Sequence, residues 1–278
     1  MTTAADLPIE LVQGILLTSV GTSLNQAAIV GRISRHIYNL IKPILFRTFV
    51  YWDEEHSWPG KLDLKWLTTN GGFARNLLLC DEELGQNLPI ILGSCPNLRN
   101  IAIWLHSNYD FPTLLEPLSQ LRPRQLSADL PRLFGGLFEE RHAHLPMFAN
   151  LTHLEVGGDR DDWNIIKGIQ YIPRLTHLSI PIHRDLPVPP IIRDALEHCN
   201  NLAILVVFSS HRVNSLELMN TGEVVIEAPL PSMIQDITDP RIISLKCNYL
   251  KEWELGSQGG RGMWTLAEEV MERRTRNL

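Results

Sequence analysis

The chain has 278 residues, of which 44% are hydrophobic and 20% are charged, and its formal net charge is −6. This composition is typical of a globular protein with one or two domains, and it excludes a disordered chain. The negative charge excludes a broad basic surface, so we expect no nucleic-acid partner. No run of about 18 apolar residues occurs, so we expect no membrane-spanning helix.

Four cysteines, at positions 80, 95, 199 and 247, lie far apart and form no Cys-x-x-Cys pair. We interpret them as reduced, buried thiols rather than as metal ligands. The first ten residues lack the basic start and the apolar run of a secretory signal. We therefore expect a protein of the cytoplasm or the nucleus.

The first fifty residues have the apolar spacing of three short helices. Leu7, Leu11 and Ile15 recur every four residues, which predicts one apolar helix face. Two further helical stretches follow, and we expect Pro43 to stop or bend the last of them. Three helices in about 40 residues cannot bury all their apolar side chains alone. This segment must therefore pack on the rest of the chain or on a partner.

The segment resembles an F-box. The resemblance lies in Leu7-Pro8-x-Glu10-Leu11, in the pair Ile15-Leu16, in Val30-x-x-Ile33-Ser34-Arg35, and in Pro43-Ile44-Leu45-Phe46-Arg47. That last run is similar to the close of F-boxes common in mushroom-forming (basidiomycete) fungi. One departure is in the third helix, where the family often has Cys-Arg-x-Trp, whereas residues 31–36 contain no tryptophan.

The resemblance implies docking on a Skp-type adaptor, and through it on a cullin, within an SCF ubiquitin ligase. The candidate adaptor-binding residues are Leu7, Pro8, Leu11, Ile15, Leu16, Val30 and Ile33. The alternative is that these helices only cap the domain that follows them.

From about residue 60 a strand signature recurs, with apolar residues at its first, fourth and sixth positions. The clearest copies are residues 98–103, 151–156, 175–180 and 202–207, and weaker copies are residues 74–79, 123–128 and 242–247. Successive copies begin 24, 25, 28, 24, 27 and 40 residues apart. Most of these steps fall within the period of leucine-rich repeats. The fourth and sixth positions alternate along a strand and so point to one buried face.

We therefore expect strands at these seven positions, joined by helical stretches and stacked into a parallel sheet with helices outside. Residues 209–240 would hold an insertion, and residues 264–276 a capping helix that begins with the capping box Thr265-x-x-Glu268. The predicted fold class is α/β: a three-helix F-box-like module (residues 1–50) followed by an irregular leucine-rich-repeat-like solenoid (residues 51–278). This body resembles the divergent leucine-rich arrays attached to fungal F-boxes. A generic α/β domain is the alternative.

The sequence contains no recognisable catalytic or nucleotide-binding motif, so we predict no enzyme, no cofactor and no metal site. His142-Ala143-His144 lacks a nearby third ligand. His153 and His177 occupy the third position of two copies, which points away from the buried face, and Arg99 lies in the same part of another copy. An acidic loop follows residue 156. The candidate target-binding residues are Arg99, His153, His177, Asp159 and Asp161. The alternative is that these are polar residues that only face water.

Two functions fit these features. In the first, the chain is a substrate receptor whose head binds the adaptor and whose array holds an unknown target protein. In the second, it is a non-catalytic binding scaffold whose helices only cap the array. An enzyme with an unrecognised site is a third, weaker alternative.

Overall fold

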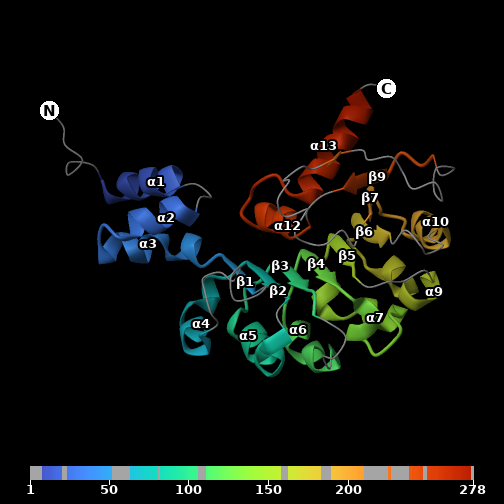
Figure 1. The fold of residues 1–278 in the computed structure, drawn as a ribbon, viewed down its shortest axis with the longest axis horizontal. Coiled ribbons are helices and arrows are strands. Elements are labelled where there is room, and N and C mark those ends of the chain that lie inside the picture. The colour runs from blue at the N-terminus through green and yellow to red at the C-terminus, as the bar shows by residue number, and fades with distance from the viewer. Residues whose placement is uncertain are drawn as a thin grey trace.

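The computed structural model describes residues 8–20, 24–51, 63–80, 82–105, 111–157, 162–182, 189–209, 225–226, 238–246 and 249–276. These residues form an α/β protein on one nine-stranded sheet of order β1-β2-β3-β4-β5-β6-β7-β9-β8 (Figure 1). Each neighbouring pair from β1 to β7, and β7 with β9, is parallel, whereas β8 runs antiparallel to β9. No helix among the described residues is both long enough and apolar enough to cross a membrane.

The strands are β1 (Thr48–Tyr51), β2 (Asn76–Leu79), β3 (Asn100–Ile103), β4 (Gln125–Ala128), β5 (His153–Val156), β6 (His177–Ile182), β7 (Ile204–Ser209), β8 (Val225–Ile226) and β9 (Ile242–Lys246). The longer helices are α1 (Ile9–Val20), α2 (Leu24–Gly31), α3 (Arg35–Leu45), α4 (Leu64–Asn70), α5 (Leu88–Ser94), α10 (Pro189–His198), α12 (Tyr249–Ser257) and α13 (Met263–Arg276). Shorter turns of helix are η2 (Gly71–Phe73), η3 (Glu82–Asn87), η4 (Phe111–Leu114), α6 (Leu115–Ser119), α7 (Leu130–Leu133), α8 (Glu140–Ala143), η5 (Pro146–Phe148), α9 (Trp163–Ile166) and η6 (Lys167–Tyr171).

A strand lies at each of the seven predicted positions, and successive strands pair in sequence order from β2 to β7. The sheet begins earlier than we expected, because β1 starts at Thr48, inside the segment assigned to the helical head. Helix α3 also runs through Pro43 to Leu45, so the proline does not end it. The chain therefore passes from α3 into the sheet through only Phe46 and Arg47.

One face of the sheet, here called the outer face, is covered by helices α4 to α10 (Figure 1). Its strand positions carry apolar residues such as Leu77, Leu154 and Leu205, all fully buried. They form one continuous core with helix residues such as Leu88 and Ile192. Burial of this apolar surface is the main force that holds the array together.

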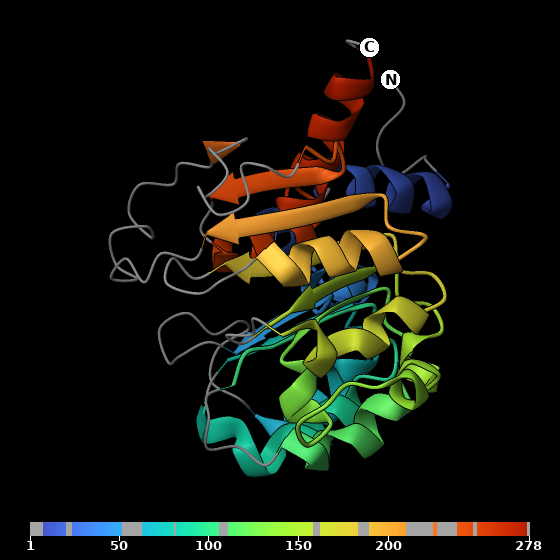
Figure 2. The ribbon, with the colours of Figure 1, turned by 90° about the vertical axis from the view of Figure 1, so that its right-hand side faces the viewer.

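The opposite face, here called the inner face, carries helices α12 and α13 (Figures 1 and 2). Trp253 of α12 packs on Leu78 and Ala102, and residues of α13 pack on the inner side of β7 and β9. We expected the last helix to cap the end of the array, but it lies across the sheet instead. It also begins at Met263, two residues before the predicted capping box.

The turn between α12 and α13 depends on a close approach of two backbones. A Cβ atom on Gly262 would lie only 2.6 Å from the carbonyl oxygen of Glu252. Glycine is therefore required at this corner, and it lets α13 fold back over the inner face.

Helices α1 to α3 form a separate cluster beside β1 (Figure 1). Val20, Ala27, Ile41 and Leu45 are buried and belong to the same continuous core as the outer face. Ser34 caps α3, because its side chain accepts a hydrogen bond from the backbone N–H of Ile37 (3.2 Å). The helical head is thus joined to the array by packing as well as by the chain.

Candidate functional site

Four arginines form a column at the edge of the sheet where strands β1 to β4 begin. Arg47, Arg75, Arg99 and Arg124 each come directly before the first residue of a strand, and those first residues pair in register. Their backbones continue the sheet ladder: each of the last three donates its N–H to the carbonyl of the arginine before it, at 2.7–2.8 Å. Adjacent strands lie about 4.8 Å apart, so the column is about 14 Å long.

All four arginines line one open cleft of about 510 Å³ between this edge, helix α3 and the end of α12. The cleft lining contains no aspartate and no glutamate among the described residues. Arg75 donates a hydrogen bond to the carbonyl of Asn97 (3.1 Å) and is half-buried, whereas the other three are exposed. Guanidinium groups bind carboxylates and phosphates through paired hydrogen bonds, so this arginine cleft suits an anionic ligand.

Next to the arginines, the inner face carries a row of hydrogen-bonded amides. Asn100 donates to the side chain of Asn76 (2.8 Å), which in turn donates to the hydroxyl of Thr48 (2.8 Å) and to the carbonyl of Ser257 (2.6 Å). The last of these bonds ties α12 to the sheet. Because the side chain of Asn76 is buried and hydrogen-bonded to three neighbouring residues, it holds the floor of the arginine cleft in place and is not available to bind a ligand.

The same row continues on β5 and β6 as two histidines. The rings of His153 and His177 stack with their centroids 4.0 Å apart and their planes 14° apart. Trp264 of α13 packs edge-on against both rings, at 5.1 and 5.8 Å between ring centroids. The prediction that these histidines point away from the outer face is confirmed, but α13 covers them.

A threonine lies beside Nδ1 of each histidine. The hydroxyl oxygens of Thr152 and Thr176 lie 2.8 Å from Nδ1 of His153 and His177, respectively. Each hydroxyl also lies 3.2 Å from a backbone carbonyl, that of Arg124 for Thr152 and that of Thr152 for Thr176. The threonines therefore hold both rings in place at Nδ1.

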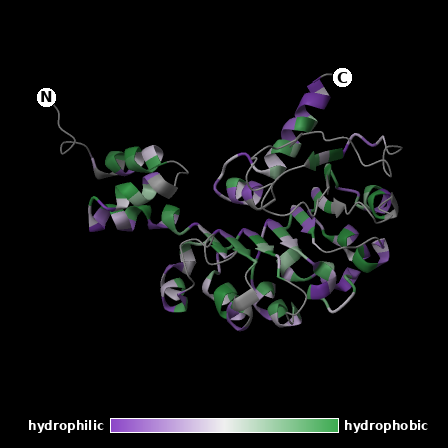
Figure 3. Ribbon diagram, viewed as in Figure 1, coloured by the Kyte–Doolittle hydropathy of each residue, from purple (hydrophilic) through white to green (hydrophobic). Residues whose placement is uncertain are grey.

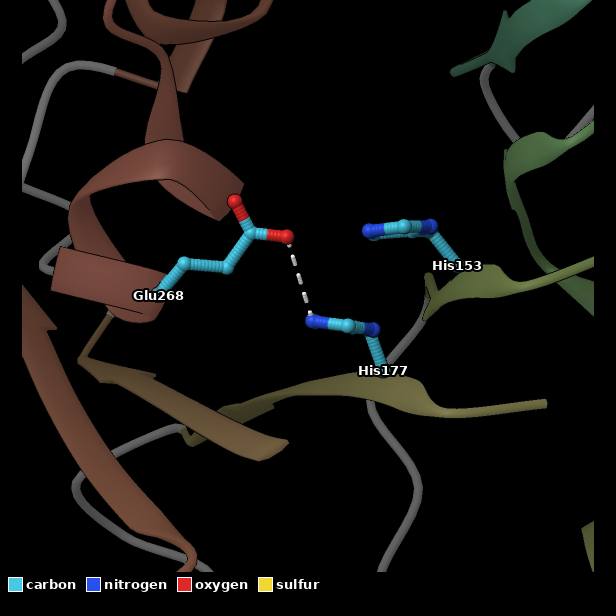
Figure 4. A group of neighbouring side chains, drawn as sticks. All are labelled: His153, His177 and Glu268. Carbon is cyan, nitrogen blue, oxygen red and sulfur yellow. Dashed lines mark ion pairs between the residues drawn. The ribbon is translucent and has the colours of Figure 1, made fainter. Parts of the chain in front are cut away.

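Glu268 of α13 faces the Nε2 edge of both rings (Figure 4). Its Oε1 lies 3.5 Å from Nε2 of His177. Burial lowers the pKa of His177 to about 4, and burial together with the neighbouring His177 lowers the pKa of His153 to about 3. Both rings are therefore neutral at pH 7, so the contact between Glu268 and His177 is not an ion pair.

Two carboxylates lie inside the sheet–helix layer. Glu155 is buried beside Ser127, whose hydroxyl also accepts a hydrogen bond from Nε1 of Trp104 (2.6 Å). Glu252 of α12 is only 3% exposed, and its Oε2 has no hydrogen-bond partner in the described part of the chain. Burial raises the pKa of both groups, that of Glu155 well above its ordinary value. Both line a small cavity of about 80 Å³ under α12 and α13.

The structure brings three of the predicted target-binding residues to neighbouring parts of one surface. Arg99 and His153 both line the arginine cleft, and His177 lies beside His153. Asp159 and Asp161 fall outside the described residues. Neither His142 nor His144 belongs to a group of three possible metal ligands among the described residues. His142 instead accepts a hydrogen bond from the backbone N–H of Glu139 (3.0 Å) at Nδ1.

Sequence reasoning missed the other three arginines of the cleft. A signal was present, because arginine follows the first apolar residue of the signature in three copies and again in the run Phe46-Arg47-Thr48-Phe49. The sequence matches no protein-family model, and a comparison with curated proteins gave no match.

Proposed function

We propose that the chain is a non-catalytic substrate receptor of the F-box type. Its helical head would dock on a Skp-type adaptor of a cullin-based ubiquitin ligase, and its array would hold a target protein. The observation that carries this proposal is an apolar face on the head that the rest of the chain leaves exposed.

The head has two apolar faces, and only one of them packs on the array. Five large apolar side chains of the head are exposed by 39–67%: Leu11, Ile15, Leu17, Ile29 and Ile33. Elsewhere among the large apolar residues of the described chain, only Ile90, Leu137, Tyr171 and Leu255 are exposed to a similar degree, and they lie on three different helices and one loop. Helices α1 and α2 are correspondingly among the most hydrophobic of the molecule (Figure 3).

A group of exposed apolar side chains on one small module is typical of a protein-binding surface. If the head were only a cap, Ile41 and Leu45 would be sufficient to cover the sheet edge, and the remaining positions could be polar. The exposed face includes three of the residues carried over from the resemblance, namely Leu11, Ile15 and Ile33. Of the others, Pro8 is exposed, Leu16 and Val30 are half-buried, and Leu7 falls outside the described residues.

The body supports the proposal through its regularity. Strands β1 to β7 begin 24 to 28 residues apart, each followed by a connection on the outer face. This order is that expected of a divergent leucine-rich-repeat solenoid, in which every unit contacts its neighbours and buries a shared core. We propose that the target lies at the strand-start edge, where the arginine cleft opens.

The charge of the cleft indicates the kind of target. Four guanidinium groups in a row about 14 Å long match an extended segment of four or five residues, at about 3.3 Å per residue. Phe73 is the only aromatic ring of phenylalanine, tyrosine or tryptophan in the described lining. Single-stranded nucleic acid needs several such rings for base stacking, so we propose an acidic peptide segment of the target.

The adaptor hypothesis can be tested by pull-down with a purified Skp-type adaptor. We expect the intact chain to bind it, and the double substitution Ile15→Asp with Ile33→Asp to remove binding at micromolar concentration. A matched control, Ile90→Asp with Leu137→Asp, changes two apolar residues outside the head that are about half exposed and should leave binding intact. Absence of binding by the unsubstituted chain, or binding that survives the head substitutions, would contradict docking by this face.

The target hypothesis has a separate test, fluorescence polarisation with a labelled octaglutamate peptide. Arg99→Glu with Arg124→Glu should weaken binding at least about tenfold, because paired charge contacts are lost and replaced by repulsion. The control Lys65→Glu with Lys167→Glu makes the same change of net charge on the outer side and should have little effect. Equal losses in both variants, or tighter binding of oligothymidylate than of octaglutamate, would reject the acidic-peptide site without affecting the adaptor proposal.

A further inference from the structure

We propose that the cavity of about 80 Å³ under α12 and α13 is a binding site for a protonated primary amine. The ammonium group would pair with the carboxylate of Glu252, and the alkyl stem would lie against Trp253 and Trp264. The amine that we assign to the cavity is the lysine side chain of a segment bound in the neighbouring arginine cleft. Only this last step rests on the proposed function.

The cavity is lined by a buried carboxylate that lacks a hydrogen-bond donor. Glu252 is 3% exposed, and its Oε2 meets no donor among the residues that the structure describes. Two cations act on Glu252 electrostatically, but neither of them lines the cavity: Lys251 is exposed, and Arg261 is hydrogen-bonded to Glu269. Because buried polar groups in folded proteins are nearly always hydrogen-bonded, Glu252 calls for a donor from outside the chain.

The charge of the cavity favours a ligand with a single positive charge. Two carboxyl groups, those of Glu155 and Glu252, belong to the described lining, which contains no lysine, arginine or histidine. Burial raises the pKa of both and that of Glu155 well above its ordinary value, so Glu155 stays neutral while Glu252 ionises. The last turn of α12 and the first turn of α13 both reach the cavity, and their opposite dipoles offset each other. One negative charge therefore faces the ligand.

The size of the cavity favours a primary ammonium group among the organic cations. A water molecule takes up about 30 Å³, so about three heavy atoms fit. Nζ of lysine and its last two methylene carbons have this size, whereas a guanidinium or trimethylammonium group on one methylene carbon has five heavy atoms. Trp253, Met263 and Trp264 form an apolar part of the lining, on which methylene groups can pack. The three N–H donors of the ammonium group can reach Glu252 and further acceptors.

The cavity adjoins the arginine cleft. Four residues, Asn100, Gln125, Gly256 and Ser257, line both of them. A segment whose carboxylates lie on the arginines can therefore place a nearby lysine side chain under α12. The two sites attract opposite charges, so together they select an acidic segment that contains a lysine over one that is acidic throughout.

The amine site is tested by titrating the full chain with propylammonium chloride at constant ionic strength. We expect saturable shifts of the indole N–H signals of Trp253 and Trp264 in NMR spectra, and binding of neutral 1-propanol at least about tenfold weaker. Glu252→Gln should weaken propylammonium binding at least about tenfold, and Glu155→Gln less than about threefold. The control Glu272→Gln, at an exposed carboxylate of α13, should leave the affinity unchanged.

The source of the amine is tested with two labelled peptides, Glu-Glu-Glu-Glu-Gly-Gly-Lys and the same sequence ending in norleucine. Fluorescence polarisation should show binding of the lysine peptide at least about fivefold tighter, although its extra positive charge is repelled by the arginine cleft. Glu252→Gln should remove this advantage and leave the affinity of the norleucine peptide unchanged. The glutamine keeps the shape of the side chain and removes a buried charge, and the unshifted indole signals verify that the variant is folded.

Each outcome decides one step. Propylammonium that does not bind saturably, or that binds the Glu252→Gln variant equally well, would overturn the amine site. Saturable propylammonium binding without an advantage of the lysine peptide would support the amine site and assign it to free amines instead of the bound segment. Failure of both peptides to bind would reject the acidic-peptide function alone, because the propylammonium titration does not involve the arginine cleft.

Discussion

The two faces of the same sheet differ in both chemistry and regularity. At corresponding positions the outer face carries leucine, isoleucine, valine or alanine in every strand from β2 to β7, and all of these residues are buried. The inner face changes along the array, from asparagines on β2 and β3 to histidines on β5 and β6 and to Ile204 and Val206 on β7. The outer face therefore specifies the fold, and the inner face is free to vary.

The inner face itself has two parts, which differ in how accessible they are. Beside β1 to β4 the strand-start edge is open and lined by arginines. Beside β5 to β9 the inner face is covered by α13. One array thus presents a charged, accessible cleft next to a covered layer that is polar on β5 and β6 and apolar on β7 and β9.

The largest expected effect comes from the buried histidines. The pKa values of His153 and His177 are lowered to about 3 and about 4 in the folded chain, against an ordinary value of 6.5. Between pH 6.5 and pH 4 the unfolded chain therefore binds protons that the folded chain does not, and stability falls as the pH falls. We expect these two residues to account for a loss of roughly 3–6 kcal/mol over this range.

Urea unfolding between pH 4 and pH 7.5 in the presence of EDTA would measure this effect. The variant His153→Gln with His177→Gln serves as the control, since its difference from the intact chain isolates the two histidines from other titrating groups. That difference should change steeply below pH 6.5 and level off above it. A difference that is independent of pH would show that the rings titrate normally in the folded chain.

The second prediction concerns the outer face. Leu154 is fully buried in the core between β5 and its neighbours. Leu154→Ala removes apolar contacts and leaves a cavity, which should lower the free energy of unfolding by about 2–5 kcal/mol. Leu137→Ala, at a position that is 50% exposed, should cost much less. Comparable losses at the two positions, measured by urea denaturation, would contradict the assignment of stability to the outer face.

The outer face is also the part of the molecule that the sequence predicts well. Its apolar signature locates seven strands, because alternation along a strand and a period of about 25 residues leave few other arrangements. The signature did not predict β1. Residues 46–51 follow directly on helix α3, and their apolar residues fit a continuation of that helix as well as they fit a strand. The expectation that Pro43 stops or bends the preceding helix differs from the structure in its first part, because α3 continues through Pro43 to Leu45.

The candidate site is less predictable for a physical reason. The arginine column is visible in the sequence once copies are aligned by register, but the cleft also needs the end of α12. The direction in which α12 and α13 fold back depends on close packing at Gly262 and on contacts made by Trp253. Neither has a periodic pattern. The meeting of Glu268 with the two histidines, more than 90 residues away in the sequence, therefore emerges only from the structure.

The third prediction tests the buried acidic layer. Burial raises the pKa of Glu155 well above its ordinary value, although its hydrogen bond to Ser127 acts in the opposite direction. A raised pKa in the folded chain means that stability is complete at low pH and declines as the pH rises above about 4.3, where the unfolded chain ionises. Glu155→Gln keeps the shape and the hydrogen-bonding capacity but cannot ionise. We expect it to stabilise the chain by about 1–2 kcal/mol at pH 7.5.

The measurement is again urea denaturation, now compared between pH 7.5 and pH 4. At pH 4 both states of the intact chain are largely protonated at this position, so the stabilising effect of glutamine should disappear. A variant that is equally destabilised at both pH values would indicate that Glu155 is held by specific hydrogen bonds that an amide cannot replace.

The smallest expected effect on stability is at the arginine cleft, and its small size is informative. Arg99 and Arg124 are exposed, carry like charges on adjacent strands, and have no acidic residue beside them in the described cleft lining. Arg99→Ala with Arg124→Ala should therefore leave the free energy of unfolding unchanged or raise it by about 0.5 kcal/mol, more at 20 mM than at 500 mM NaCl. Residues placed for folding do not behave in this way. If the substitution instead destabilises the chain by more than about 1 kcal/mol at both salt concentrations, the arginines belong to the fold, and the distinction between a structural outer face and a binding edge fails.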